Sequence, residues 1–139
     1  MRVVIDTNVL VSGLFWKGPA SEILDAFLAG RFELYASEEL IAELREVLSR
    51  PKFQTHALQR GLDVPEVVER LKATARIIPV DSLPPQPALR DPDDIIVLEC
   101  AVSANATMIV TGDQDLLVLE SFAGISILTP ARALSELTK

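Results

Sequence analysis

Four acidic residues stand far apart in the chain, each at a place from which an α/β fold would carry it to the same edge of a sheet. Carboxylates gathered in this way repel one another and raise one another's pKa unless a cation compensates them. Oxygen ligands suit Mg²⁺ or Mn²⁺, whereas a zinc site would need more histidine and cysteine than the one of each present here. The pattern therefore indicates a divalent-metal site with Mg²⁺ or Mn²⁺ as cofactor. The four residues are Asp6, Glu43, Asp94 and Asp113.

The elements that must position these acids alternate between strand and helix signals. Short β-branched runs predict strands, and apolar periodicity between capping residues and prolines predicts helices. Pro51 lies just past the second predicted helix, where a helix commonly stops. Strands that alternate with helices predict a parallel sheet of about five strands in an α/β fold, with helices on both faces. The predicted strands are 2–5, 32–36, 77–80, 107–110 and 125–128, and the predicted helices are 21–29, 37–49, 65–76, 92–104, 114–119 and the segment from 130 onward.

In such a fold, ligands bind beyond the carboxyl ends of the strands. Asp6 directly follows the first strand, so it either faces this site or caps the next helix. Glu43 borders the apolar stripe of its helix and could reach back toward the helix start, although a surface glutamate would show the same pattern. Both residues stay open to either interpretation when taken singly.

The helical wheel gives Asp94 the clearest assignment. It lies on the apolar side of its helix, opposite Glu99, so we expect it to be buried or to face a site. An ionised carboxylate is tolerated there only when it is paired, capped or bound to metal. Asp113 follows a strand and could either cap the next helix or bind metal. For Asp91 and Asp93, ordinary turn and capping roles are predicted.

Length and composition predict one domain, 1–139, because 139 residues with 49% hydrophobic content suffice for a single core but not for two. No run approaches the roughly 18 apolar residues that a membrane span requires. The N-terminus opens into a strand rather than a leader segment. A single cysteine, Cys100, cannot form a disulfide within the chain. We therefore expect a cytoplasmic protein without a membrane anchor.

The net charge of −7 argues against binding nucleic acid through the overall field of the protein. The distribution is uneven, however, because basic residues outnumber acidic ones by seven to four between Arg45 and Arg76. This segment could hold phosphates beside the acidic site, or could simply consist of solvated helix faces. The candidate RNA-binding residues within it are Arg45, Arg50 and Lys52.

Two aromatic residues, Phe15 and Trp16, come early in the chain, near the expected mouth of the site. They could stack on a base, although packing in the core is the more usual role of such residues. The single histidine, His56, falls in the polar basic segment and is predicted to be a surface residue.

Four motifs in this order resemble PIN-domain proteins, in particular the toxins of toxin–antitoxin pairs that are related to VapC-like ribonucleases. The resemblance covers essentially the whole chain, and it rests on the order and spacing of the motifs more than on any one of them. The motifs are Val-Val-Ile-Asp6-Thr7-Asn8, Ser37-Glu-Glu-Leu-Ile-Ala-Glu43, Asp91-Pro-Asp-Asp94 and Thr111-Gly-Asp113-Gln-Asp115.

The resemblance implies an endoribonuclease that hydrolyses RNA phosphodiester bonds with Mg²⁺ or Mn²⁺ and leaves a 5′-phosphate. It further implies a cognate antitoxin as partner and a homodimer. The acidic quartet would be catalytic, with Asp6, Asp94 and Asp113 as metal ligands and Glu43 orienting or deprotonating a water. The implied supporting residues are Thr7, Asn8, Thr111 and Asp115.

One alternative is a PIN module that binds RNA or a protein partner without cleaving RNA. Intact acids count against this alternative. Other enzyme classes fit less well: a haloacid-dehalogenase phosphatase needs a second Asp where Asn8 stands. A receiver domain needs its acid pair after the first strand rather than at Asp93 and Asp94. No Gly-rich phosphate loop is present.

Overall fold

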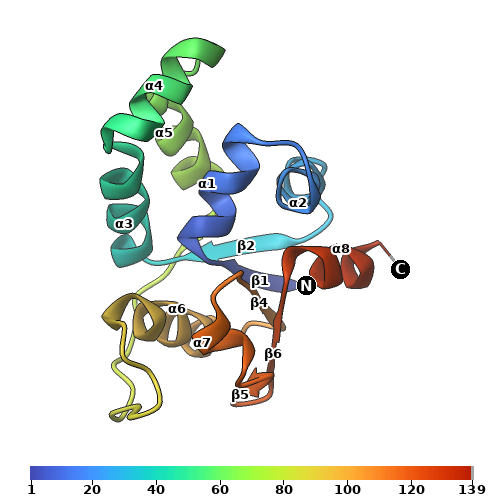
Figure 1. Ribbon diagram of the computed structural model, residues 1–139. Helices are drawn as coiled ribbons and strands as arrows, with labels where there is room; N and C mark the ends of the chain where they lie inside the picture. Colours follow the sequence, from blue (N-terminus) through green and yellow to red (C-terminus); the bar gives the residue numbers. More distant parts are fainter. Residues whose placement is uncertain (139) are drawn as a thin grey trace.

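The computed structural model describes residues 1–138, and Lys139, the last residue of the predicted domain, lies outside the described residues. The described chain forms a six-stranded sheet whose strands are β1 (Arg2–Ile5), β2 (Glu33–Ala36), β3 (Arg76–Ile77), β4 (Met108–Val110), β5 (Ser121–Phe122) and β6 (Ile125–Leu128). Their order across the sheet is β3-β2-β1-β4-β6-β5 (Figure 1). All neighbouring pairs are parallel except β5 with β6. The predicted parallel sheet is thus confirmed, with one short antiparallel strand at its edge.

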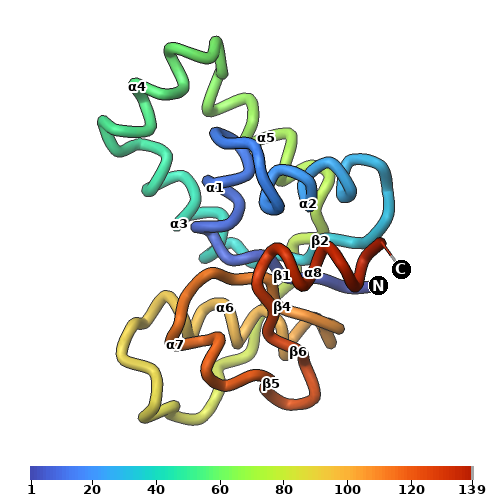
Figure 2. The backbone as a smooth tube through the Cα atoms, turned by 45° about the vertical axis from the view of Figure 1, so that its right-hand side comes forward, coloured from blue at the N-terminus to red at the C-terminus, as the bar shows by residue number. Residues whose placement is uncertain are grey.

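Eight helices connect and cover the strands among residues 1–138: α1 (Thr7–Phe15), α2 (Pro19–Leu28), α3 (Glu38–Leu48), α4 (Pro51–Arg60), α5 (Val64–Thr74), α6 (Pro92–Ser103), α7 (Gln114–Leu117) and α8 (Pro130–Leu137). Figure 1 shows α6 and α7 on one side of the sheet, with α1, α2 and α8 on the other. Figure 2 shows the same separation from a second direction. Within this part of the chain, no helix combines the length and the apolar character needed to cross a lipid bilayer.

The buried apolar residues form two clusters, one on each face of the sheet, and strand β1 contributes to both. Its side chains alternate, so Val3 and Ile5 pack into the core under α1, α2 and α3, while Val4 packs with Val97 and Leu98 of α6. All three β1 residues are almost fully buried. A strand that is apolar on both sides is typical of a parallel sheet with both faces covered.

Three elements occur where the sequence pattern predicts none. Helix α1 contains weak helix formers, including β-branched residues and Gly13, so it depends on packing against its neighbours more than on intrinsic propensity. Helix α4 begins at Pro51, which therefore opens a helix instead of only following one. Strand β5 is too short for a periodic signal. Strand β3 also differs from the prediction, because it ends at Ile77 instead of extending to Val80.

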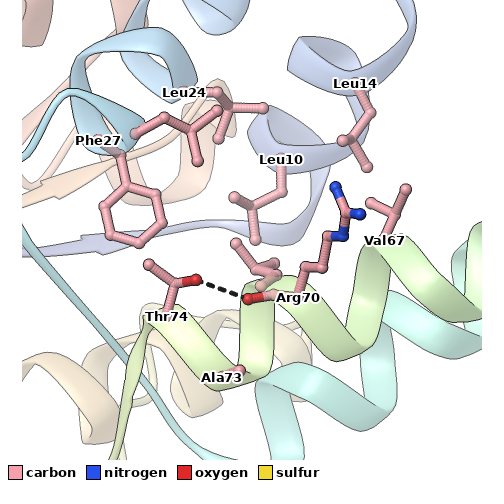
Figure 3. A pocket seen from close by; sticks show the side chains of 10 residues that line it. Leu10, Leu14, Leu24, Phe27, Val67, Arg70, Ala73 and Thr74 are labelled. Carbon is pink, nitrogen blue, oxygen red and sulfur yellow. Dashed lines mark hydrogen bonds between the residues drawn. The ribbon is translucent and has the colours of Figure 1, made fainter.

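An apolar pocket of about 380 Å³ lies where α1, α2 and α5 meet (Figure 3). Side chains from all three helices line it, with the aliphatic part of Arg70 at its edge. Within residues 1–138, no Asp or Glu lines this pocket, so it is separate from the predicted acidic site. The other lining residues are Leu10, Leu14, Leu24, Phe27, Leu28, Val67, Leu71, Ala73 and Thr74.

The crossing of α1 over α2 predicts a steric requirement at Gly13. A Cβ atom there would lie 2.7 Å from Leu24 Cδ1 and 2.8 Å from the carbonyl oxygen of Ala20. We expect Gly13→Ala to lower the free energy of unfolding by about 1–3 kcal/mol, because the packed helices must move apart. Chemical denaturation measures this change. Gly112→Ala is the control, since no atom lies within 4 Å of its added Cβ. A Gly13→Ala variant as stable as the natural chain would contradict the close approach.

Candidate active site

Asp6 stands at the carboxyl end of the central strand, and its side chain is held from the neighbouring strand. Its amide donates a hydrogen bond to the carbonyl oxygen of Val110 at 2.9 Å. Asp6 occupies the N-cap position of α1, but its side chain makes no capping hydrogen bond. Instead, the Thr111 hydroxyl donates to Asp6 Oδ2 at 2.7 Å. The buried carboxylate is thus oriented mainly by the residue that directly follows β4, and the backbone of Thr7 at the start of α1 also favours its ionised form.

The turn after β4 places two more carboxylates at the same edge. Thr111 Oγ1, which donates to Asp6, also accepts a hydrogen bond from the Asp113 amide at 3.0 Å. Asp113 caps α7, and its Oδ1 accepts from the Asp115 amide at 2.9 Å. The Asp113 carboxyl also lies within hydrogen-bonding reach of Asp94, whose pKa it raises. Capping and metal binding, the two interpretations of Asp113, are therefore compatible.

Asp94 is the most deeply buried acid of the group, with 3% of its surface exposed. It lies in the first turn of α6, which is capped by Asp91 through a hydrogen bond from the Asp93 amide to Asp91 Oδ1 at 2.9 Å. Asp94 Oδ2 is buried and has no hydrogen-bond partner among residues 1–138. A buried carboxylate oxygen without a donor is costly. The position therefore requires either a proton or a cation.

Glu43 approaches the same edge from α3. The residue is half-buried, and its Oε2 atom is buried without a hydrogen-bond partner in the described part of the chain. The buried hydroxyl of Thr7 also has none, although it lies near enough to Glu43 to lower the pKa of that carboxyl. Asn8, the next residue, is exposed. Glu43 thus brings a further buried carboxylate oxygen to this edge, with the Thr7 hydroxyl beside it.

The acids carry charge that no basic side chain offsets. Among residues 1–138, no Lys or Arg forms an ion pair with any of five acids at this edge, which are Asp6, Glu43, Asp94, Asp113 and Asp115. Carboxylate oxygens of three of them lie within 4.8 Å of one another, and these are Asp94, Asp113 and Asp115. Clustered oxygen donors with unsatisfied lone pairs match what Mg²⁺ or Mn²⁺ requires. The residues present therefore fit a divalent cation. This closest trio contains Asp115 where the sequence interpretation puts Asp6.

Burial and mutual repulsion shift the acids toward their protonated forms. Burial, followed by the charges of Asp93 and Asp6, raises the pKa of Glu43 to about 7. Burial and the adjacent Asp113 raise the pKa of Asp94 to about 7. Burial also raises the pKa of Asp6, and the hydrogen bond from Thr111 opposes that rise. Shifts of this kind are expected where a site is built for a cation.

Asp93 has a larger electrostatic role than the sequence analysis assigns to it. It is exposed, yet its charge raises the pKa of both Glu43 and Asp6, so it faces the same cluster. The signal that could have identified it is its position in the first turn of a helix whose start lies at the carboxyl edge.

Two of the three candidate RNA-binding residues are engaged in ion pairs. Arg45 binds Glu69 at 2.6 Å, and Arg50 binds Glu46 at 3.0 Å. Lys52 forms no ion pair in the described part of the chain, and its Nζ lies 5.3 Å from the ring centroid of Phe53. Of these three side chains, Lys52 is the one whose charge is available to a ligand.

The chain belongs to the PIN domain family, whose model matches residues 2–115. This membership confirms the predicted family. Among solved structures, the chain is similar to a chain in the crystal structure of VapBC2 from Rickettsia felis, in which VapBC2 is bound to a DNA fragment from its promoter. The two share 15% identity over 91% of this chain and 97% of that chain, with a TM-score of 0.60. At this identity the likeness shows the fold. No curated protein matches the chain significantly.

Two buried threonines at the site offer a matched test of hydrogen bonding. Thr111→Val removes a hydroxyl that serves both Asp6 and Asp113, so we expect the free energy of unfolding to fall by about 1–3 kcal/mol. The Thr7 hydroxyl makes no well-formed hydrogen bond within residues 1–138, although it favours the ionised form of Glu43, so the loss in Thr7→Val should stay below about 0.5 kcal/mol. Chemical denaturation compares the variants. Equal losses would contradict the role assigned to Thr111.

The raised pKa values predict that metal-free protein loses stability as the pH rises. A carboxyl with a higher pKa in the folded state holds its proton more tightly there, so ionisation above the ordinary values of 3.8 and 4.5 destabilises the fold. The loss should be complete once the pH exceeds about 7, the folded-state pKa of Glu43 and Asp94. We expect roughly 1–3 kcal/mol in total, because exposure of Glu43 screens part of the effect. Thermal unfolding in EDTA between about pH 5 and pH 8 measures it.

The controls for this pH effect use neutral variants and added metal. Asp94→Asn with Glu43→Gln should flatten the pH dependence, whereas Glu39→Gln, at an exposed position of the same α3 helix, should preserve it. Excess Mg²⁺ or Mn²⁺ should restore stability at high pH by binding the ionised cluster. Stability that is independent of pH in EDTA would show that the acids are not destabilised by burial.

Proposed function

We propose that this protein is a metal-dependent endoribonuclease and the toxin of a toxin–antitoxin pair. The observation that carries the proposal is the group of buried, unpaired carboxylates at the carboxyl edge of the sheet in a PIN-domain chain. The choice of RNA as substrate rests on the resemblance of the four motifs to VapC-like ribonucleases. Phosphodiester hydrolysis is the reaction that such a carboxylate cluster supports.

The cation, Mg²⁺ or Mn²⁺, would be held by Asp94, Asp113 and Asp115, with Asp6 beside them. When bound, it would lower the pKa of a water and stabilise negative charge on the leaving oxygen. Thr111 keeps the Asp6 carboxylate and the Asp113 amide in place through one hydroxyl. It is thus a positioning residue, and its contribution is to hold the ligands in one arrangement before substrate binds.

Glu43 is the candidate proton acceptor. Its pKa of about 7 in the metal-free protein lies near the pH at which an intracellular enzyme would work, and an effective general base has a pKa in this range. One of its oxygens has no hydrogen-bond partner in the described chain and is free to accept from a water. Glu43 would orient that water and take its proton, while Thr7 beside it favours the ionised carboxylate.

RNA and a cognate antitoxin are the proposed partners, and the protein would act as a homodimer in the cytoplasm. Lys52 would contact RNA directly. Arg45 and Arg50 would each have to leave a carboxylate partner, Glu69 or Glu46, in order to bind a phosphate. The antitoxin proposal is supported by the similarity to a chain of VapBC2 and by the motif resemblance. We also propose that 1–139 is a single PIN domain. Strand β6 lies beyond the residues that match the family, yet it pairs with β4, which lies within them.

The test is cleavage of a panel of structured and single-stranded RNAs with Mg²⁺, Mn²⁺ or EDTA. Asp94→Asn retains the side-chain shape but removes the buried charge, so we expect cleavage to fall by more than about a hundredfold. Asp25→Asn, at an exposed position on α2, is the matched control and should cleave normally.

Two outcomes would contradict the nuclease proposal. Equal traces of cleavage by the natural chain and Asp94→Asn would identify a contaminating nuclease. Tight RNA binding by both, with no cleavage of any RNA in either metal, would favour a PIN module that binds without cleaving.

A further inference from the structure

Trp16, the one tryptophan of the chain, is held in a cluster of rings and is still 41% exposed. It directly follows α1. Its ring contacts His56 and Phe53 of α4 in edge-on arrangements, with centroids 5.4 Å and 6.4 Å away. Phe15 is buried behind it and stacks on Phe53 at 5.6 Å. The cluster therefore supports an aromatic ring whose position is restricted and whose surface is partly open to solvent.

This ring cluster is accompanied by positive charge. Lys17 follows Trp16 in the chain, and Lys52 precedes Phe53, over whose ring its Nζ lies at 5.3 Å. Neither lysine forms an ion pair within residues 1–138. No acidic residue occurs between Glu46 and Asp63, although the protein as a whole carries a net charge of −7. The combination of an exposed ring with free lysines suits a polyanion that has flat bases, which is a nucleic acid.

The cluster also lies at a useful distance from the acids. Helix α1 starts beside Asp6 and ends at Phe15, and at 1.5 Å per residue it spans roughly 14 Å. Helix α3, which carries Glu43, leads from the same edge of the sheet toward α4 (Figure 1). With a rise of 3.4 Å per stacked nucleotide, the distance corresponds to roughly four nucleotides. One strand could therefore occupy both places.

We propose that Trp16 is a base-stacking platform for single-stranded RNA, with Lys17 and Lys52 contacting the flanking phosphates. The inference rests on the proposed function, which makes RNA the substrate, and adds where the strand binds beyond the acidic cluster. The strand must be single, because bases within a duplex already stack on each other and cannot open onto a side chain. Stacking on one ring is tolerant of sequence, so this contact supplies affinity and register instead of base identity.

The first experiment measures binding without cleavage. In EDTA, short single-stranded oligoribonucleotides should quench the fluorescence of the natural chain saturably, and Trp16 is its only source of tryptophan emission. By anisotropy of labelled RNA, Trp16→Ala should weaken binding by roughly 5- to 100-fold, which is the usual effect of removing a base-stacking ring. Trp16→Phe keeps a ring and should lose much less. Leu58→Ala, at an exposed apolar position on the same α4 helix, should bind normally.

A second measurement separates stacking from charge. Lys17→Gln and Lys52→Gln should each weaken binding to all RNA sequences and reduce the slope of log affinity against log salt by about 0.7. Inorganic polyphosphate, which has charge but no bases, should bind the natural chain and Trp16→Ala equally. An RNA hairpin without free single strands should bind more weakly than a single strand of equal length.

Unchanged fluorescence at saturating RNA, together with natural affinity in Trp16→Ala, would overturn the platform. Failure of the natural chain to bind any of the RNAs would also overturn it. So would a Trp16→Ala variant that loses as much affinity for polyphosphate as it does for RNA. The nuclease proposal fails separately: Asp94→Asn should bind RNA and quench Trp16 as the natural chain does. Trp16-dependent binding without cleavage would uphold the platform alone, and cleavage that is independent of Trp16 would uphold the nuclease alone.

Discussion

Repulsion among carboxylates at the end of the parallel sheet is the constraint on which the site depends. The pairing of Ile5 with Val110 puts Asp6 and Thr111 on adjacent strand ends, and the Thr111 hydroxyl then joins Asp6 to the turn that carries Asp113. Helices α3 and α6 bring two more acids with unpaired oxygens to this edge. The sheet is thus a rigid support that holds like charges together, and a bound cation would relieve their repulsion.

The fold is largely predictable because its strands are buried on both faces. Continuous apolar runs such as Val3 to Ile5 identify a parallel sheet, and the alternation of elements then dictates its connections. Helices α1 and α4 were harder to predict for physical reasons. The β-branched residues and Gly13 of α1 do not favour a helix locally. A proline such as Pro51 is common both just after one helix and in the first turn of the next, so it does not show by itself that α4 begins there.

The position of the candidate site follows from the sequence more readily than its internal contacts do. Asp94 could be identified because a carboxylate on an apolar helix face must have a compensating partner. In contrast, the grouping of Asp115 with Asp94 and Asp113 depends on a turn of a few residues. The pairing of Arg45 with Glu69 joins helices α3 and α5 through two residues that are 24 positions apart. Long-range side-chain geometry of this kind is not encoded in periodicity or spacing.

The acidic site poses a difficulty for the proposed RNA substrate, since both the acidic cluster and the net charge of −7 repel phosphate. A bound cation reverses the local field at the cluster itself, but it does little for nucleotides farther along the strand, where salt screens charge within about 8–10 Å. Contact with an aromatic ring is largely independent of that field. An exposed Trp16 flanked by Lys17 and Lys52 would therefore retain a strand that the rest of the surface repels, and would leave the acids to act on the phosphate that the strand brings to them.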